Sequence, residues 1–299
     1  MVQLIYYTKL GGHNMDNSVK LRKILEQNNF FSLPGVYDPM GAKMAEKIGF
    51  EAAYLSGGAL SLMGLGRPDI GFLNLTDLII SLERILYTVD IPIITDTDNS
   101  FGNALHAAKT ANALQRMGVA GLQIDDNVLP PAKPIASKEY ITWDLLAPKL
   151  EAIRMSTSDS FVIVLRTIIG KSLGIDSAVE RANHAADLGV DYVFIEGLNS
   201  IEEMEYACNN SRAKLMVNLN ENVFAASVDI GLVKKMGFKI GLFPISTMHI
   251  AAKAMYEVLS MIKNEGTAYS MKNQMMSFTD LMELLEFNTD SNKYLELYK

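Results

Sequence analysis

The stretch Ile91-Pro-Ile-Ile-Thr-Asp-Thr-Asp-Asn-Ser-Phe-Gly-Asn103 joins an apolar run to two carboxylates, a glycine turn and an alanine-rich segment with helical spacing. This order predicts a buried strand that ends in Asp96 and Asp98, followed by a helix from about residue 104 to Met117. Ligands bind at the carboxyl ends of parallel strands, and two neighbouring carboxylates suit a hard divalent cation. The alternative is that Asp98 and Asn99 cap the following helix. The stretch alone leaves both interpretations open.

The same unit recurs along the chain, with short apolar runs alternating with amphipathic helical patterns. The predicted strands are Phe31–Tyr37, Ala52–Ser56, Ile91–Ile94, Val119–Ile124, Phe161–Leu165, Tyr192–Ile195, Lys214–Val217 and Lys239–Phe243. Eight strands that are apolar on both faces, each followed by a helix, are typical of a (β/α)8 (TIM) barrel. We expect one domain over residues 1–299, with its core at about 30–265. A further helical pattern, Ser277 to Glu286, lies in the C-terminal extension 266–299, and such a helix often packs on a neighbouring subunit.

The composition limits the classes of partner. The chain has 299 residues, of which 49% are hydrophobic and 20% charged, as expected for a globular protein with a large core. Its formal net charge of −7 argues against nucleic acid or an anionic membrane as partner. The single cysteine, Cys208, allows no disulfide within the chain, and no run has the length of a membrane span. The amino terminus does not have the pattern of a signal peptide. We therefore expect a cytoplasmic protein with a small-molecule partner.

Polar side chains stand at or just after the carboxyl ends of the predicted strands. They are Ser56, Asp96, Asp98, Asp125, Arg166, Glu196 and Asn218. Because the strand ends of a barrel meet at one rim, we expect these side chains to form one site, although each alone could be a helix cap or a solvated loop residue. The three aspartates offer oxygen ligands for Mg²⁺, directly or through water. The four histidines are scattered without the spacing of a zinc site.

Two of these features suit a carboxylate ligand. The segment Ser56-Gly57-Gly58 can present backbone N–H groups, and Arg166 can bind a carboxylate through two N–H groups or stabilise an enolate oxygen. A phosphate-binding loop is excluded at Gly170-Lys171-Ser172, because Leu165 occupies the position that requires the first glycine.

Seven short motifs follow one another in a specific order. They are Tyr54-Leu-Ser-Gly-Gly58, Pro68-Asp69, Thr95-Asp-Thr-Asp98, Ile124-Asp-Asp126, Leu165-Arg-Thr167, Phe194-Ile-Glu-Gly197 and Val217-Asn218. With them the chain, from about Leu33 to Ile262, resembles the isocitrate lyase/phosphoenolpyruvate mutase superfamily. The resemblance implies a (β/α)8 barrel, usually a homotetramer that exchanges its last helix between subunits. It also implies Mg²⁺, or Mn²⁺ in its place, and small 2-oxo or 2-hydroxy carboxylates that react through a pyruvate-like enolate.

The resemblance also implies a role for each matching residue. Asp96 would be the direct metal ligand, while Asp69, Asp98 and Asp125 would hold the waters of the ion. The implied metal residues are therefore Asp96, Asp98 and Asp125. The implied substrate-binding residues are Ser56, Gly57, Gly58 and Asp69. The implied catalytic residues are Tyr54, Arg166, Glu196 and Asn218.

Three departures from the family pattern bear on the reaction. The loop Pro130–Ser137 lacks the Cys and His of the methylisocitrate lyases and the Phe-Pro-Lys of the phosphonate enzymes. Ile168 replaces the Asp of the lyases, and Asp125 replaces the usual Glu. The loop is similar to the oxaloacetate decarboxylase branch, which favours a Mg²⁺-dependent carbon–carbon bond-cleaving decarboxylase or lyase. The alternatives are a P–C bond mutase or hydrolase, a specialised biosynthetic homologue, and a non-catalytic protein that binds a carboxylic acid.

Overall fold

The computed structural model describes residues 16–129, 139–287 and 295. Within these residues, eight parallel strands pair in sequence order and close into a barrel, with the first strand beside the eighth. The strands are β1 (Phe31–Val36), β2 (Ala53–Leu55), β3 (Ile93–Asp96), β4 (Gly121–Asp125), β5 (Val162–Thr167), β6 (Tyr192–Ile195), β7 (Lys214–Asn218) and β8 (Ile240–Phe243). The predicted (β/α)8 barrel is therefore confirmed.

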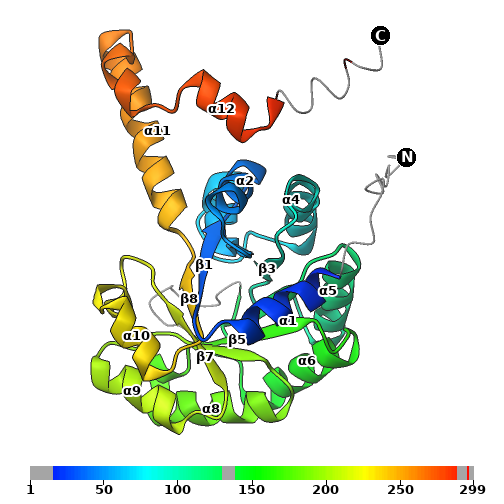
Figure 1. Ribbon diagram of the computed structural model, residues 1–299. Helices are drawn as coiled ribbons and strands as arrows, with labels where there is room; N and C mark the ends of the chain where they lie inside the picture. The colour runs from blue at the N-terminus through cyan, green and yellow to red at the C-terminus, as the bar shows by residue number, and fades with distance from the viewer. Residues whose placement is uncertain (1–15, 130–138, 288–294, 296–299) are drawn as a thin grey trace.

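Helices alternate with the strands along the chain and surround the barrel (Figure 1). The longer helices are α1 (Asn17–Gln27), α2 (Pro39–Ile48), α4 (Leu75–Thr88), α5 (Ala104–Arg116), α6 (Trp143–Met155), α8 (Ile175–Asp187), α9 (Ile201–Asn210), α10 (Ile230–Met236), α11 (Ser246–Glu265) and α12 (Phe278–Leu284). The shorter ones are α3 (Gly57–Ala59), α7 (Gly170–Leu173), the π-helix η1 (Leu60–Gly64) and the 3-10 helices η2 (Phe224–Ser227) and η3 (Tyr269–Gln274). Among the described residues, no helix combines the length and apolar character needed to cross a bilayer.

Local sequence signals set the ends of the helices. At the start of α2, the Asp38 side chain accepts a hydrogen bond from the Gly41 N–H at 2.6 Å, and Pro39 occupies the first turn. The helix stops at Gly49, whose φ of 101° is the left-handed conformation that glycine adopts without a Cβ clash. These signals are local, so the sequence alone indicates a helix between the two strands.

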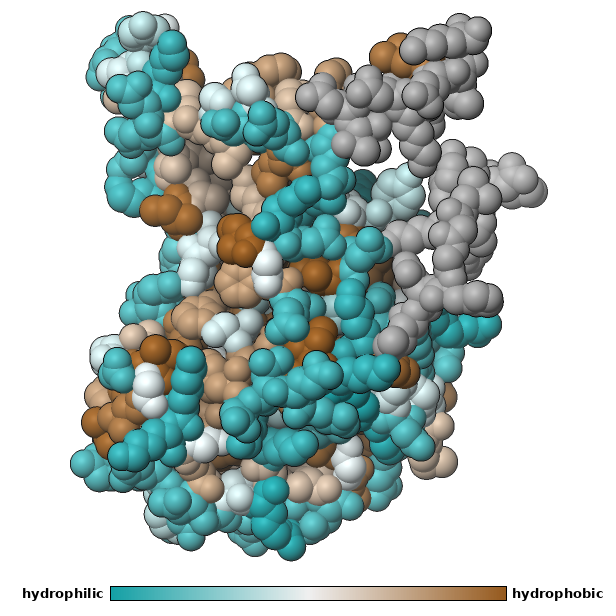
Figure 2. All heavy atoms as spheres, in the orientation of Figure 1, coloured by the Kyte–Doolittle hydropathy of each residue, from teal (hydrophilic) through white to brown (hydrophobic). Residues whose placement is uncertain are grey.

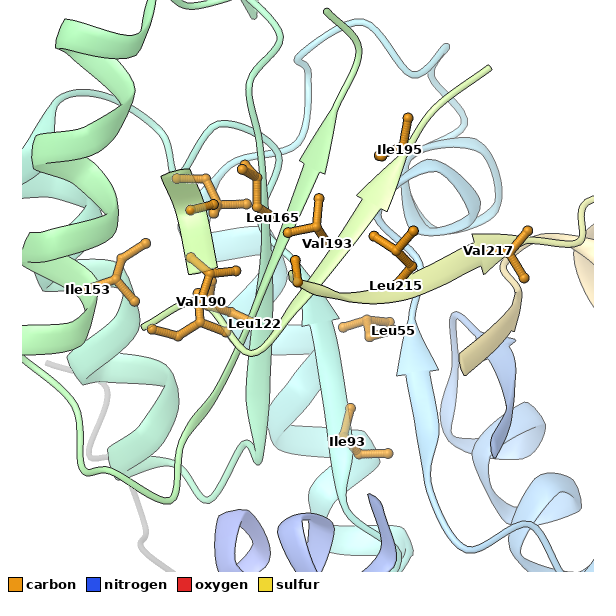
Figure 3. Close-up of a cluster of buried hydrophobic side chains, with 14 of the residues drawn as sticks. Leu55, Ile93, Leu122, Ile153, Leu165, Val190, Val193, Ile195, Leu215 and Val217 are labelled. Carbon is orange, nitrogen blue, oxygen red and sulfur yellow. The ribbon is translucent and has the colours of Figure 1, made fainter. Parts of the chain in front are cut away.

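The apolar side chains of the strands alternate between two buried layers. In β6, Val193 and Ile195 belong to the layer between the strands and the surrounding helices (Figure 3). Tyr192 and Phe194 belong to the second layer, which also contains Leu21 of α1. This alternation has the two-residue period of a strand, and it explains why the strands are apolar on both faces. The carboxyl ends of the strands are thus left to the polar residues.

The C-terminal part leaves the barrel. Helix α11 projects beyond it, and η3 and α12 follow at its far end (Figure 1). The predicted terminal helix is present as α12, and Lys47 of α2 forms an ion pair with Glu286, just after this helix, at 2.5 Å. Apolar side chains reach the surface over α11 (Figure 2). Those that are largely exposed on it are Ile250, Met255, Tyr256, Leu259 and Ile262.

Candidate active site

The segment after β3 forms a tight turn at the carboxyl rim of the barrel. Asp98, Ser100 and Phe101 have φ values of 47°, 61° and 59°, a left-handed conformation that non-glycine residues rarely adopt. The cap of α5 is Asn103, whose side chain accepts hydrogen bonds from two N–H groups of the first turn. The alternative that Asp98 and Asn99 cap this helix is therefore wrong, since the chain needs several more residues to turn. Asp98 remains buried at the rim.

Four carboxylates lie close enough to influence one another at this rim. Burial raises the pKa of Asp98 to about 9, and the charges of Asp96, Asp125 and Asp69 add to the effect. Burial also raises the pKa of Asp125 to about 8, against the opposing effect of Arg166. The pKa values of Asp69 and Asp96 are raised as well, first by burial. The structure thus brings together the predicted metal residues and Asp69.

Backbone contacts fix these carboxylates in place. The N–H of Asp98 donates to Asp96 Oδ1 at 3.1 Å, and the N–H of Asp125 donates to the carbonyl of Asp98 at 2.6 Å. The buried ammonium of Lys149, on α6, donates to the carbonyl of Asn99 at 2.5 Å. Gln123 Nε2 donates to Asp125 Oδ1 at 3.0 Å. Sequence reasoning missed both Lys149 and Gln123, because neither stands at a strand end.

The glycines after β2 allow a close approach to two of the carboxylates. A Cβ at Gly57 would lie 3.1 Å from the carboxyl group of Asp96, and one at Gly58 would lie 3.0 Å from Asp69 Oδ2. The side chain of Ser56 accepts a hydrogen bond from the Ala59 N–H at 3.3 Å, so it caps its own helical turn. The structure therefore places this predicted substrate-binding segment directly beside the aspartates.

Tyr54, on β2, contacts one of the same carboxylates. Its hydroxyl hydrogen-bonds to Asp96, and its side chain belongs to the buried layer inside the barrel. Burial, reinforced by the charges of Asp96 and Asp125, raises the pKa of Tyr54 well above its ordinary value. The phenol therefore stays protonated and acts as a hydrogen-bond donor to Asp96.

Arg166, at the end of β5, bridges two acidic residues. Its Nη1 donates to Asp125 Oδ2 at 2.7 Å, while Nε and Nη2 donate to Glu196 Oε2 at 3.2 and 3.1 Å. Burial opposes the charged form, but Asp125 and Glu196 outweigh it and raise the pKa of Arg166. The guanidinium also lies over the ring of Phe194, 5.4 Å from its centroid. Its position is thus fixed from three sides.

Glu196 and Asn218 line a cavity of about 260 Å³ at the carboxyl ends of β6 and β7. Asn218 Oδ1 accepts a hydrogen bond from the Asn220 N–H at 2.9 Å. The second oxygen of Glu196, Oε1, accepts from Lys171 Nζ at 3.0 Å. The sequence analysis considered Lys171 only as part of the rejected phosphate-binding loop. A cation six residues after the predicted strand Phe161–Leu165 was nevertheless a usable signal.

A second network lies behind the site and was also missed. Asp126, which is fully buried, accepts hydrogen bonds from Arg181 Nη1 at 2.6 Å and from the Ile168 N–H at 2.8 Å. Ile168 itself is buried in the protein interior. The network joins the end of β4 to the end of β5, and so it fixes the relative positions of Asp125 and Arg166.

The donor set fits a hard divalent cation. Asp69, Asp96, Asp98 and Asp125 are four oxygen donors, and Arg166 is the cation that lowers the pKa of each of them. Burial and mutual repulsion disfavour the ionised forms of these carboxyl groups, and a bound cation would stabilise the ionised forms. In the described part of the chain, no three His, Cys, Asp or Glu side chains are arranged so that they could hold a metal ion by themselves. A site with few direct carboxylate ligands and several waters agrees both with the four clustered carboxylates and with the lack of three direct ligands. This is the arrangement that Mg²⁺ favours.

The loop Pro130–Ser137, on which the sequence-based choice of reaction depends, lies wholly outside the described residues. At its two ends, the N–H of Val128 donates to the carbonyl of Glu139 at 2.9 Å, and the N–H of Ile141 donates to the carbonyl of Asp126 at 2.6 Å. Both ends of the loop therefore stand beside the site.

Comparisons with known proteins agree with this architecture. Residues 21–263 match the phosphoenolpyruvate phosphomutase family. The chain is 32% identical to a 2-methylisocitrate lyase of Aeropyrum pernix, over 90% of this chain and 87% of that protein. It is 28% identical to the 2,3-dimethylmalate lyase of Eubacterium barkeri, over 91% and 94% of the two chains. A structure of oxaloacetate acetylhydrolase superposes with a TM-score of 0.85 at 27% identity, over 92% and 95%.

The chain therefore belongs to the phosphoenolpyruvate mutase/isocitrate lyase superfamily, and the predicted membership is confirmed.

Proposed function

We propose that this protein is a Mg²⁺-dependent lyase that cleaves a carbon–carbon bond in a small 2-oxo or 2-hydroxy carboxylic acid through an enolate. The observation that carries the proposal is the bridge from Asp125 through Arg166 to Glu196, beside a cluster of buried carboxylates. The bridge places a fixed positive charge next to a site that can hold a cation. The names of the relatives, 2-methylisocitrate lyase and 2,3-dimethylmalate lyase, support the same class of reaction.

The metal would be held by Asp96, with Asp69, Asp98 and Asp125 binding its waters. When bound, the ion would supply a Lewis acid for an oxygen of the substrate. The backbone of Gly57 and Gly58 passes close to Asp96 and Asp69, and its N–H groups would donate to a carboxylate of the substrate. This placement would bring the 2-oxo or 2-hydroxy acid to the middle of the carboxylate rim.

The chain's own residues would then stabilise the charge that develops. Cleavage of the bond leaves an electron pair that is delocalised onto an oxygen, and Arg166 offers N–H donors in a fixed direction toward such an oxygen. Glu196 and Asp125 hold the guanidinium so that no reorientation is needed during the reaction. Tyr54 orients Asp96 through its hydroxyl group. Because the acceptor of Asn218 is occupied by Asn220, its amide N–H₂ is the group that it can offer to a substrate.

We further propose that the protein assembles as a homotetramer that exchanges its C-terminal helices. The exposed apolar residues of α11, together with Phe278 of α12, support this arrangement, because a monomer would leave them in water. Coverage by another subunit would bury them.

A coupled assay of pyruvate release tests the proposed activity. We expect the protein with Mg²⁺ to form pyruvate from at least one of oxaloacetate, 2,3-dimethylmalate and 2-methylisocitrate, and EDTA to abolish this activity. Replacing Arg166 by Met should lower kcat by roughly 10²–10³. The matched control is Arg212→Met, because Arg212 is an exposed arginine that pairs with Asp187 on the outer surface. If no acid in the panel is cleaved with Mg²⁺, or if the Arg166 variant is as active as the control, the proposal fails.

A further inference from the structure

The cavity at the carboxyl ends of β6 and β7 has a lining of both apolar and polar side chains. Phe194, Val217, Val223 and Phe224 supply apolar surface, and the polar groups come from Lys171, Glu196, Asn199, Asn218 and Asn222. Glu196 is shared between this cavity and the Arg166 bridge. The cavity therefore adjoins the site at Glu196 and has room for the non-reacting end of a small substrate.

Lys171 is held in the cavity wall by the backbone around it. It lies on α7, directly after β5, where the Ile168 N–H is anchored by the buried carboxylate of Asp126. Its aliphatic stem crosses Gly197 so closely that a Cβ there would lie 2.5 Å from Lys171 Cε. Gly197 also has a φ of 86°, which other residues rarely adopt. The ammonium group is therefore placed by packing as well as by its ion pair.

The charges around Lys171 favour an anionic ligand. Glu196 already receives two hydrogen bonds from Arg166, so its charge is shared between two cations. An ammonium group has three N–H donors, and one of them suffices for Glu196. Asn218 adds an amide donor on the same wall, because its oxygen accepts from the Asn220 N–H. Two donors, one of them charged, facing a partly apolar cavity are suited to a carboxylate at the end of a short carbon chain.

We propose that Lys171 is a substrate-binding residue that selects substrates whose non-reacting end carries a carboxylate. The inference rests on the proposed function, because it takes the reacting end to lie at the aspartate rim. It goes beyond that function by assigning a specificity role to a residue outside the predicted site.

Binding of matched ligand pairs to the Mg²⁺-loaded protein, measured by titration calorimetry, tests the assignment. The first pair is 2-oxoglutarate and 5-methyl-2-oxohexanoate, in which an isopropyl group replaces the terminal carboxylate. The second pair, 2-oxoadipate and 6-methyl-2-oxoheptanoate, is one methylene longer. We expect the wild-type protein to prefer the charged member of at least one pair. Lys171→Met should reduce this preference by about tenfold or more, and Lys171→Arg should retain most of it.

The ratio of the affinities for the charged and the neutral member of a pair distinguishes recognition of the carboxylate by Lys171 from a merely structural role of this residue. A variant that only disturbed Glu196 would weaken both members equally and would leave the ratio unchanged, which would overturn the proposal. A wild-type preference for the neutral member of both pairs would also overturn it. Oxalate, which reaches only the rim, reports on the proposed function by itself. If oxalate binds while the ratio does not depend on Lys171, the Lys171 assignment fails and binding at the rim, on which the proposed function depends, stands.

Discussion

Asp98→Asn will make the metal-free protein more stable at neutral pH. Asp98 is 7% exposed, and burial, followed by the charges of Asp96, Asp125 and Asp69, raises its pKa from 3.8 to about 9. Below pH 3.8 the group is protonated in both the folded and the unfolded chain, and its stabilising contribution is complete. Above pH 3.8 only the unfolded chain ionises, so the free energy of unfolding falls until the pH reaches about 9.

The size of the effect follows from this window. Each pH unit between 3.8 and neutrality lowers the free energy of unfolding of the wild type by about 1.4 kcal/mol. Asp98→Asn removes this loss, so the substitution should raise the free energy of unfolding by up to about 4 kcal/mol at pH 7. Asn suits this position because it tolerates the φ of 47° at residue 98. The hydrogen bonds that join residue 98 to Asp96 and Asp125 use backbone atoms of residue 98, so the substitution retains them.

Mg²⁺ should stabilise the wild-type protein more than it stabilises Asp98→Asn. A ligand at about 100 times its Kd stabilises a folded protein by about 2.7 kcal/mol. The wild-type protein should gain this stability increasingly as the pH rises from 5 to 8, because binding displaces protons from carboxyl groups. Asp98→Asn should gain less, because the carboxylate that would accept hydrogen bonds from the waters of the ion has been replaced by a neutral amide.

Urea unfolding followed by circular dichroism, in EDTA and in Mg²⁺ from pH 5 to pH 8, measures both effects. Asp159→Asn, at an exposed aspartate, is the matched control and should behave as the wild type does. The reasoning is refuted if Asp98→Asn is less stable than the wild type in EDTA at pH 7 and keeps the same dependence on pH.

Two further predictions concern residues outside the rim. Arg181→Met should lower the free energy of unfolding by about 3–5 kcal/mol, because it leaves the carboxylate of Asp126 buried without its counter-ion. Chemical denaturation measures this loss, and a change below about 1 kcal/mol, the range of the exposed control Arg212→Met, would contradict it. The double substitution Tyr256→Glu and Leu259→Glu should lower the molar mass of the protein in light scattering, because it places charge on the apolar face of α11. Asn264→Glu, at an exposed polar position of the same helix, is the control, and an unchanged mass would argue against assembly through this face.

The barrel could be predicted because its signals are local. The alternation of strand and helix can be followed in segments such as β1, which runs into Asp38, and α2, which stops at Gly49. Each signal acts within a few residues, through capping, backbone conformation or the two-residue period of a strand. The chain order of the acids was likewise sufficient to place Asp96 and Asp125 at strand ends, because a parallel barrel gathers all its carboxyl ends at one rim.

The local signals were less informative where a turn is held by distant contacts. The sequence left open whether Asp98 caps the next helix, and the structure assigns the cap to Asn103. The difference arises from the left-handed conformations at Asp98, Ser100 and Phe101, which are rare for their residue types. Such a turn persists because tertiary contacts support it, among them the hydrogen bond from Lys149 to Asn99. Lys149 is 50 residues from Asn99 in the chain, so the local sequence around Asp98 could not indicate this contact.

What the sequence determined by itself was the fold, the family and the set of acids at the rim. What only the tertiary structure decided was which charges meet: Arg166 with Asp125 and Glu196, and Lys171 with Glu196. Asp125 and Arg166 are 41 residues apart in the chain, and they become neighbours because the register of β4 and β5 pairs them across the sheet. Electrostatic interactions depend on distance and burial rather than on order along the chain. The register and packing of the barrel therefore determined the chemistry of residues whose identities the sequence had already provided.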